Sequence, residues 1–423
     1  MAELAGVKSL LIALLGGAAV SVLIERLLTP QPNLRRPAAT WLLHVGIWLL
    51  GFAFELCLFQ RPWFAAAFVL AFMLFVVLVS NAKYAVLREP FIFQDFEYFM
   101  DALRHPRLYI AFLGAWRALL AIAGFVTAVY IGLAFEAPLP LAVWPQAMLA
   151  ITGSGVLLLA LGAAGLGAAT FNPADDLKQL GLAGSLWRYM REERRAIDRA
   201  AYGSMFADVG PLSSSRPHIV VVQSESFFDA RRLHKGIERK VLENWDALQG
   251  DAVQHGRLKV AAWGANTVRT EFSFLSGRAI DSLGVHKFNP YRKLARQGIV
   301  TLATHLRALG YRTVCVHPYP ASFYNRHIVF PQMGFDEFID IKSFDGVLKS
   351  GPYIGDIAVA EKITALIGAS DKPLFVFAIT MENHGPLHWE KLGDAERQQY
   401  FTAPLPADCD DLAVYLRHLA NAD

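Results

Sequence analysis

This chain contains little cysteine and has almost no net charge. The 423 residues contain three cysteines, Cys57, Cys315 and Cys409, and their wide spacing fits neither a disulfide framework nor a cysteine metal site. The formal net charge is only +3, which argues against the strongly basic surface of a nucleic-acid binder. Disulfide-rich scaffolds and nucleic-acid partners are therefore excluded as leading interpretations.

Apolar residues, by contrast, are abundant and unevenly spread. They make up 54% of the chain and its mean hydropathy is +0.33, whereas an ordinary soluble protein is about half apolar even with glycine included. Five stretches before residue 171 are long enough for the about 20 residues that cross a bilayer: 7–28, 39–59, 63–79, 108–135 and 139–169. We therefore predict a five-span α-helical membrane domain over residues 1–171, which begins with a span rather than a cleavable signal peptide.

Three of the polar side chains within the predicted spans need an explanation. His44, Glu55 and Arg117 are costly in hydrocarbon unless they are paired. We interpret them as inter-helix hydrogen-bonding or snorkelling groups rather than as parts of a transport path. Residues 81–99 mix charges with aromatic side chains, as segments in the membrane interface do. Residues 172–216, rich in arginine, are interpreted as an interfacial linker or stalk.

The pattern changes from residue 217 onward, where strand-like and helix-like segments alternate. The predicted strands are 218–224, 311–318 and 373–381, and the predicted helices are 301–310 and 355–370. This order is typical of a parallel sheet flanked by helices. Residues 217–423 are therefore predicted to form an α/β domain.

The predicted strands end in polar side chains of the same kind. Glu225, His317 and His384 each follow a buried strand, and the carboxyl ends of parallel strands are where open α/β sheets place their ligands. A carboxylate and two histidines suit a divalent metal and an anionic group. An alternative for the first strand is that Ser224 or Ser226 caps a following helix, with Glu225 near its positive N-terminus.

A candidate nucleophile lies in the segment WGANTVRTEFSFLSG. Gly264 and Asn266 permit a tight loop, Thr267 follows, and TEFSFL is a predicted helix. A hydroxyl at a helix N-terminus beside a metal is placed to attack an electrophile, and backbone amides would stabilise a phosphate that it acquires. The alternative is that Thr267 is a simple N-cap, with Thr270 and Glu271 in the first turn.

These motifs together resemble a known family. Glu225 after its strand, then NTVRTEF, HPYPASFYNR and TMENHGP, in this order behind five apolar stretches, resemble the lipoteichoic acid synthase and phosphoglycerol transferase family. That family is sulfatase-like and belongs to the alkaline phosphatase superfamily. The resemblance covers essentially the whole chain. It implies a multi-pass α-helical membrane domain followed by a sulfatase-like α/β domain.

The resemblance also assigns roles to residues. In the family a strand-end glutamate and a nucleophilic threonine bind one divalent ion, which implies these roles for Glu225 and Thr267. Manganese is the expected ion, with zinc or magnesium as alternatives.

The family's substrate-binding residues are implied in the same way. Histidines at the positions of His317 and His384 hold the phosphate, and an aromatic residue and an arginine grip the glycerol phosphate, here Tyr324 and Arg326. Glu382 and Asn383 are also candidates, although the pair could simply shape the loop before His384.

One part of the family pattern is missing. The family completes its metal site with an Asp-His pair at the end of a further strand, and no such pair follows His384 here. We expect the 423 residues to be a fragment whose remaining strands and ligands lie beyond Asp423. Otherwise another residue completes the site, with Asp408, Asp410 and His388 as the first candidates.

The implied activity is that of a membrane-bound phosphoglycerol transferase. Thr267 would take glycerol phosphate from phosphatidylglycerol or a related phospholipid and pass it to a glycan or polymer acceptor. A phosphoethanolamine transferase and a catalytically inactive lipid- or glycan-binding membrane protein are the alternatives. A sulfatase is disfavoured because the Cys/Ser-x-Pro-x-Arg segment that yields a formylglycine is absent. The expected location is a bacterial inner or plasma membrane with the catalytic domain extracytoplasmic, although the distribution of Lys and Arg opposes this orientation.

Overall fold

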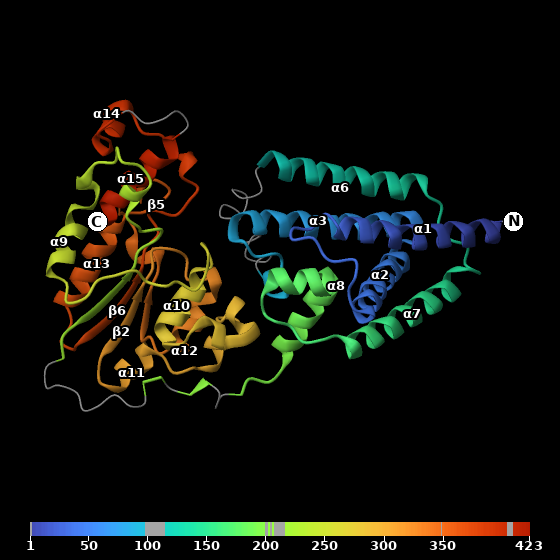
Figure 1. Ribbon diagram of the computed structural model, residues 1–423, viewed down its shortest axis with the longest axis horizontal. Helices are drawn as coiled ribbons and strands as arrows, with labels where there is room; N and C mark the ends of the chain where they lie inside the picture. The colour runs from blue at the N-terminus through green and yellow to red at the C-terminus, as the bar shows by residue number, and fades with distance from the viewer. Residues whose placement is uncertain are drawn as a thin grey trace. The chain divides into compact units, whose positions relative to one another are not determined.

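The computed structural model describes residues 2–97, 115–198, 202–203, 205–206, 216–347, 349–403 and 409–423. The chain forms two compact units, which we call the helical unit and the α/β unit (Figure 1). The helical unit comprises Met1–Ala196 with Trp263–Ala265, and the α/β unit comprises Ile197–Ala262 with Asn266–Asp423.

The helical unit contains the long apolar helices expected of a multi-pass α-helical membrane domain. Its helices are α1 (Ala2–Glu25), α2 (Ala38–Phe59), α3 (Pro62–Leu87), α6 (Ala115–Phe135), α7 (Trp144–Gly165) and α8 (Pro173–Arg194). Among the described residues, α1, α2, α3 and α7 are long and apolar enough to cross a membrane. Helix α6 covers part of the predicted span 108–135, whose residues 108–114 lie outside the described ranges.

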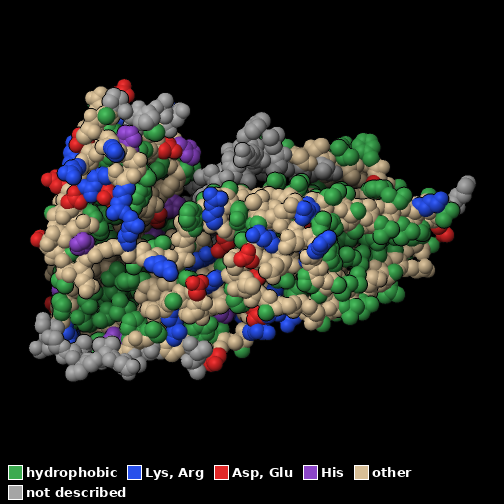
Figure 2. Space-filling view, in the orientation of Figure 1, with side chains coloured by type: hydrophobic (Ala, Val, Ile, Leu, Met, Phe, Trp, Pro, Cys, Tyr) green, Lys and Arg blue, Asp and Glu red, His purple; other side chains and the backbone are tan. Residues whose placement is uncertain are grey.

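Small residues allow α2 and α7 to pack closely. A Cβ added to Gly46 of α2 would lie 2.7 Å from the backbone nitrogen of Leu159, and one added to Gly162 of α7 would lie 2.7 Å from that of Leu43. Glycine therefore lets the two backbones approach, as in other membrane helix pairs. Large apolar side chains such as Leu15 and Phe72 remain exposed instead, and Figure 2 shows apolar side chains spread over the visible face of this unit.

The polar residues of the spans differ in their surroundings. His44 Nε2 lies 2.8 Å from the Ser21 hydroxyl of α1, which is the inter-helix hydrogen bond predicted for it. The buried Glu55 has one carboxylate oxygen, Oε2, without a partner among the described residues. The side chain of Arg117 lies outside the described part of the chain.

The segments predicted at the membrane interface are folded against the helical unit. Residues 81–87 continue α3 past its predicted end at residue 79, and a short 3-10 helix, η1, spans Phe93–Asp95, while residues 98–99 lie outside the described ranges. The first half of the predicted linker is α8, which begins at the cap Asn172 and buries Leu177 and Tyr189. It kinks at Gly181, where a Cβ would lie 1.8 Å from a guanidinium nitrogen of Arg36.

The α/β unit contains the predicted parallel sheet. Its strands are β1 (Ile219–Gln223), β2 (Arg312–Val316), β3 (Glu337–Ile339) and β6 (Leu374–Ile379), in the spatial order β1-β6-β2-β3. All three neighbouring pairs are parallel, with Gln223 opposite Ile379 and Val316 opposite Ala378. The three predicted strands are thus confirmed, and β3 is a short strand that the sequence pattern did not reveal. Two-residue strands β4 (Lys349–Ser350) and β5 (Tyr353–Ile354) form a separate antiparallel pair.

Helices cover both faces of this sheet (Figure 1). The helices of this unit are α9 (Glu243–Asp251), α10 (Thr267–Ser276), α11 (Leu302–Ala308), α12 (Arg326–Gln332), α13 (Asp356–Gly368), α14 (Asp394–Arg397) and α15 (Asp410–Ala422). Side chains alternate along the central strand β6, so that Phe375 and Phe377 pack with α10 to α12, whereas Val376 and Ala378 pack with α13. A core on each face fixes the strand ends at one edge of the sheet.

Candidate functional site

Hydrogen bonds join the ends of three neighbouring strands. The Thr380 N–H, just after β6, donates to Gln223 O at 3.1 Å, and the Glu225 N–H donates to Thr380 Oγ1 at 3.0 Å. On the other side of β6, His317 Nδ1 lies 2.9 Å from Ile379 O. The sheet order places the ends of β1 and β2 on either side of β6, so the predicted convergence of Glu225, His317 and His384 on one sheet edge is confirmed.

Glu225 lies in a turn and not at the start of a helix. Ser226 has a positive φ of 51°, and the next helical element is a 3-10 turn at Ala230–Arg232 that Asp229 caps. The helix-capping alternative for Ser224, Glu225 and Ser226 is therefore wrong. The Glu225 side chain is half-buried and accepts a hydrogen bond from Ser226 Oγ at 2.9 Å.

Thr267 is the first residue of α10 and is half-buried. Gly264, Ala265 and Asn266 precede it with φ values of 121°, 42° and 51°, so the chain enters the helix through three successive left-handed residues. Such conformations cost energy for residues other than glycine and gather at functional sites. Asn266 occupies the N-cap position, so the simple N-cap alternative for Thr267 is wrong. The helix starts three residues before the predicted TEFSFL segment.

Glu271, one turn along α10, anchors Arg326. Arg326 Nη2 donates to Glu271 Oε1 at 2.6 Å, and the Tyr291 hydroxyl also donates to the Glu271 carboxylate. Arg326 Nη1 lies 3.2 Å from His317 Nε2. The guanidinium predicted to grip the substrate is thus buried and directed at protein groups. Tyr324, predicted to assist it, presents its ring 5.2 Å from the guanidinium carbon.

The protonation state of His317 follows from these contacts. Burial, and then the adjacent Arg326 guanidinium, hold the pKa of His317 well below its ordinary value, so the ring is neutral near pH 7. Its Nδ1–H donates to Ile379 O, which leaves the Nε2 lone pair to accept from Arg326 Nη1. His317 is therefore placed to orient Arg326.

His384 lies beside a row of tyrosines. Its ring centroid is 5.6 Å from that of Tyr353, whose hydroxyl lies 3.5 Å from His384 Nδ1 and donates to Gly385 O at 3.3 Å. Tyr319 lies 6.5 Å from Tyr353 and 6.1 Å from His317, ring to ring. The two predicted phosphate-binding histidines are thus linked through aromatic rings on one side of the strand ends.

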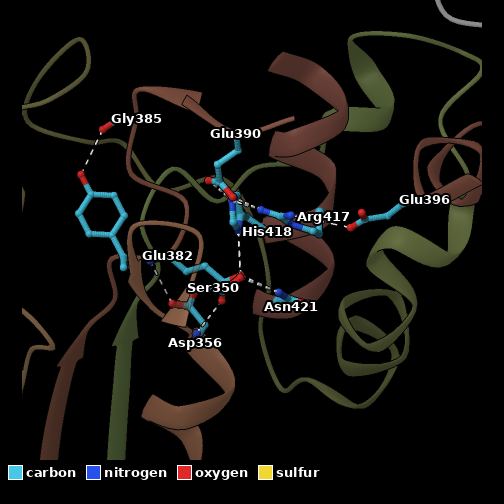
Figure 3. A network of polar contacts seen from close by, with 10 residues as sticks. Ser350, Asp356, Glu382, Gly385, Glu390, Glu396, Arg417, His418 and Asn421 are labelled. Atoms are coloured by element: carbon cyan, nitrogen blue, oxygen red, sulfur yellow. Dashed lines mark hydrogen bonds and ion pairs between the residues drawn. The ribbon is translucent and has the colours of Figure 1, made fainter. Parts of the chain in front are cut away.

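Glu382, just before the Asn383–His384 pair, lies in a buried polar network (Figure 3). Its carboxylate accepts from Ser350 Oγ at 2.6 Å, from Asn421 Nδ2 at 2.6 Å and from the Asp356 N–H at 2.7 Å. It also pairs with His418 Nδ1 at 2.8 Å. The TMENHGP loop is therefore tied to α13 and to α15.

Charge coupling in this network alters two pKa values. Burial, and then the neighbouring Glu382 carboxylate, raise the pKa of Asp356 to about 6. Burial acts to lower the pKa of His418, but its hydrogen bonds to Glu382 and Glu390 outweigh burial and raise that pKa above its ordinary value. His418 Nε2 lies 2.9 Å from Glu390 Oε1, so one imidazolium links two carboxylates.

Glu225 and Thr267 have the donor chemistry expected for a divalent metal ion, but two residues do not make a complete set of ligands. Glu225 and Thr267 offer the hard oxygen atoms that Mn²⁺ or Mg²⁺ prefers. Across the described ranges, however, no group of three or more His, Cys, Asp or Glu side chains is placed to hold an ion. Of the alternative ligands, His388 is exposed, Asp410 is paired with Arg397, and Asp408 lies outside the described residues.

The sequence patterns predicted no functional role for Glu271, Thr380 or His418. Glu271 stands four residues after Thr267, a spacing that places both on one face if the helix begins at Thr267, so its position was a usable signal. Thr380 and His418 contact residues 155 and 36 positions away in the chain, and no local pattern marks such contacts.

Comparisons with known proteins support the sulfatase-like assignment. Residues 217–423 match the sulfatase family. The chain is 27% identical over 390 residues to the capsular polysaccharide biosynthesis protein RkpI of Rhizobium meliloti, covering 85% of this chain and 70% of that protein. It is 30% identical over 230 residues to a putative cyclic beta-1,2-glucan modification protein of the same organism, covering 54% of this chain but only 34% of that protein.

Solved structures are similar at lower identity. The lipoteichoic acid synthase LtaP from Listeria monocytogenes is 21% identical with a TM-score of 0.40, and the match covers 49% of this chain and 50% of that chain. The Streptococcus pyogenes phosphoglycerol transferase GacH, in complex with sn-glycerol-1-phosphate, is 21% identical with a TM-score of 0.39, over 49% and 54%. The chain thus spans about half the length of these two structures.

Proposed function

Because residues 217–423 of this membrane protein form a sulfatase-family domain, we propose that the protein is a phosphoglycerol transferase. In this proposal it moves glycerol phosphate from phosphatidylglycerol to an extracytoplasmic glycan or polymer. Thr267 carries the proposal, because its hydroxyl stands at the first turn of α10, directly after the left-handed residues Gly264, Ala265 and Asn266. The names of the two curated relatives refer to a capsular polysaccharide and a cyclic glucan, which supports a glycan acceptor.

The chemistry proceeds in two displacements at phosphorus. Thr267 Oγ loses its proton and attacks the phosphorus atom, the bond to the diacylglycerol oxygen breaks, and diacylglycerol leaves with a proton. Glycerol phosphate then remains on Thr267 until an acceptor hydroxyl attacks the same phosphorus and frees the threonine. A divalent ion held by Glu225 and Thr267 would favour the ionised hydroxyl and offset charge on the phosphoryl oxygens.

The other residues bind and orient the phosphoryl group. In this proposal His384 donates a hydrogen bond to a phosphoryl oxygen. Arg326 adds a planar set of donors; Nη2 donates to Glu271 Oε1 at 2.6 Å, and the second N–H groups of Nη1 and Nη2 would serve a phosphoryl oxygen. His317 accepts from Arg326 Nη1 and keeps the guanidinium oriented. Membrane anchoring keeps the site near a lipid donor.

Headgroup transfer from defined vesicles tests this function. The purified full-length protein is reconstituted with Mn²⁺, an oligosaccharide acceptor and phosphatidylglycerol labelled in its headgroup glycerol. We expect labelled acceptor from wild type, none from Thr267→Ala, and normal transfer from Thr364→Ala, which alters an exposed threonine on α13. Full activity of Thr267→Ala would show that Thr267 is not the nucleophile, and Thr270 would then be the next candidate.

Two alternative functions give different results in the same vesicles. Transfer from labelled phosphatidylethanolamine, with none from phosphatidylglycerol, would identify a phosphoethanolamine transferase. Retention of lipid or glycan without transfer of either headgroup would identify a binding protein.

A further inference from the structure

Asn383 is a buried amide without a hydrogen-bond partner. Its side chain is 3% exposed, and neither Oδ1 nor Nδ2 has a partner within the described part of the chain. Leaving a buried polar group unsatisfied is unfavourable, because the group loses its hydrogen bonds to water and gains none in the protein. A folded protein retains such a group where a ligand or an ordered water molecule supplies the missing partner, or where the cost of the unsatisfied group is tolerated.

The position of Asn383 favours a ligand. It follows β6, the strand that lies between β1 and β2 in the sheet, so the ends that carry Glu225 and His317 flank it. It lies inside a turn that is closed by a hydrogen bond from the His384 N–H to Met381 O at 3.1 Å. Asn383 thus lies on a loop that leaves the same edge of the sheet as the residues predicted to bind the metal and the phosphate.

The residue before it is held from several directions. Ser350, Asp356, His418 and Asn421 all bond to the Glu382 carboxylate (Figure 3). His418 is itself fully buried and is braced by Glu390. Four hydrogen bonds therefore fix the Glu382 carboxylate, whereas no described residue forms a hydrogen bond with the side-chain amide of Asn383. Fixing the loop while leaving the amide unpaired is the arrangement of a preorganised binding group.

We propose that Asn383 binds the substrate directly, with its Nδ2–H donating to a phosphoryl oxygen, and that the Glu382–His418 pair positions it. The proposal rests on the proposed function for its choice of a phosphate ester. A neutral amide donor suits this place, because it adds a hydrogen bond to the anion without a further buried charge. The nearby imidazole of His384 points to the same anionic ligand.

Phosphate binding to full-length protein in detergent, with Mn²⁺ present, tests the direct contact. In Asn383→Leu, a variant with the same number and branching of side-chain heavy atoms, we expect affinity for inorganic phosphate to fall about tenfold, the effect of losing one hydrogen bond to a charged group. The unfolding temperature should not fall, because the amide has no partner to lose. In Asn383→Asp, repulsion between the carboxylate and phosphate should weaken binding further.

A double-mutant cycle tests the positioning role. Asn421→Ala removes one hydrogen bond from Glu382 without removing a charge, and Ser370→Ala, whose hydroxyl bonds to Lys372 O away from this network, is the control. We expect Asn421→Ala to weaken phosphate binding several-fold in wild type and to have no further effect in Asn383→Leu. An equal effect in both backgrounds would mean that the network is only structural.

Three outcomes overturn the inference, and a fourth separates it from the function. Unchanged phosphate affinity in Asn383→Leu, no phosphate binding by wild type, or tighter Mn²⁺ binding by Asn383→Asp would each contradict a phosphate contact, the last by making Asn383 a metal ligand. Wild-type protein that binds phosphate through Asn383 but transfers no headgroup would overturn the proposed function and leave the inference standing.

Discussion

Arg326 and Glu271 form a buried ion pair, with Arg326 Nη2 2.6 Å from Glu271 Oε1 and the two side chains 2% and 0% exposed. Glu271 lies one helical turn after Thr267 on α10, and Arg326 begins α12. The pair therefore fixes the helix of the proposed nucleophile against the segment that holds the proposed phosphate-binding arginine. We therefore expect this contact to affect both the stability of the α/β unit and the proposed transfer reaction.

Removing one partner of this pair should destabilise the α/β unit. Glu271→Gln leaves the Arg326 charge buried without a counter-ion, and we expect a loss of about 3–5 kcal/mol in the free energy of unfolding. Denaturant unfolding followed by circular dichroism measures it. The control is Glu337→Gln, which breaks a more exposed pair with Arg312 and should cost at most about 1 kcal/mol. Equal losses in the two variants would contradict the buried role.

Glu225→Gln should weaken divalent binding while the fold is kept. An amide lacks the negative charge that a hard cation prefers, and the Glu225 N–H to Thr380 bond, which comes from the backbone, is untouched. Metal content after dialysis against Mn²⁺ measures the effect. Glu361→Gln, an exposed site on α13, is the matched control. Equal retention of manganese by both variants would remove Glu225 from the metal site.

The stability that His418 contributes should depend on pH. Because its folded pKa is raised, this contribution is complete below the unfolded value of about 6.5 and is lost as pH rises through the folded pKa. The unfolding temperature of wild type should therefore exceed that of His418→Gln most at pH 6 or below, and the gap should narrow toward pH 9. A difference in unfolding temperature that widens as pH rises would contradict a raised pKa of His418 in the folded protein. His418 contacts Glu382, Glu390, Arg417 and Ser350, and the charge of Asp356 also acts on it.

The predicted orientation can be checked without reference to chemistry. Arg195, at the end of α8, is exposed, so a cysteine there should react with an impermeant thiol reagent in intact cells if the sulfatase-family domain is extracytoplasmic. The background should carry Cys57→Ser, because Cys57 is exposed. Labelling only after lysis would support the orientation that the Lys and Arg distribution favours.

Much of the fold was predictable because its signals are local. The strands β1, β2 and β6 are short apolar runs, and each ends in a polar group that the parallel order brings to one edge. The entry to α10 was also visible, because Gly264 and Asn266 tolerate positive φ. Its first residue, Thr267, was recognised as a candidate from the same segment.

Other features depend on distant partners. The packing of α8 was hidden by its charges, some of which are paired within the helical unit, as Glu193 is with Gln94 at 2.9 Å. Arg326 has the composition of a phosphate ligand, yet its partner Glu271 lies 55 residues earlier. The bracing of Glu382 by His418 required the whole domain to fold. Contacts of this kind follow from tertiary structure and leave no periodic signal in the sequence.

The most direct test is to identify the covalent intermediate. Full-length wild-type protein is mixed with phosphatidylglycerol vesicles and Mn²⁺ without acceptor, quenched in acid, and digested for mass spectrometry. We predict one glycerophosphoryl group on Thr267, which disappears when acceptor is added before quenching and is absent from Thr267→Ala. Turnover with Thr267 unmodified under every quenching condition, or a glycerophosphoryl group on another residue, would contradict the central claim.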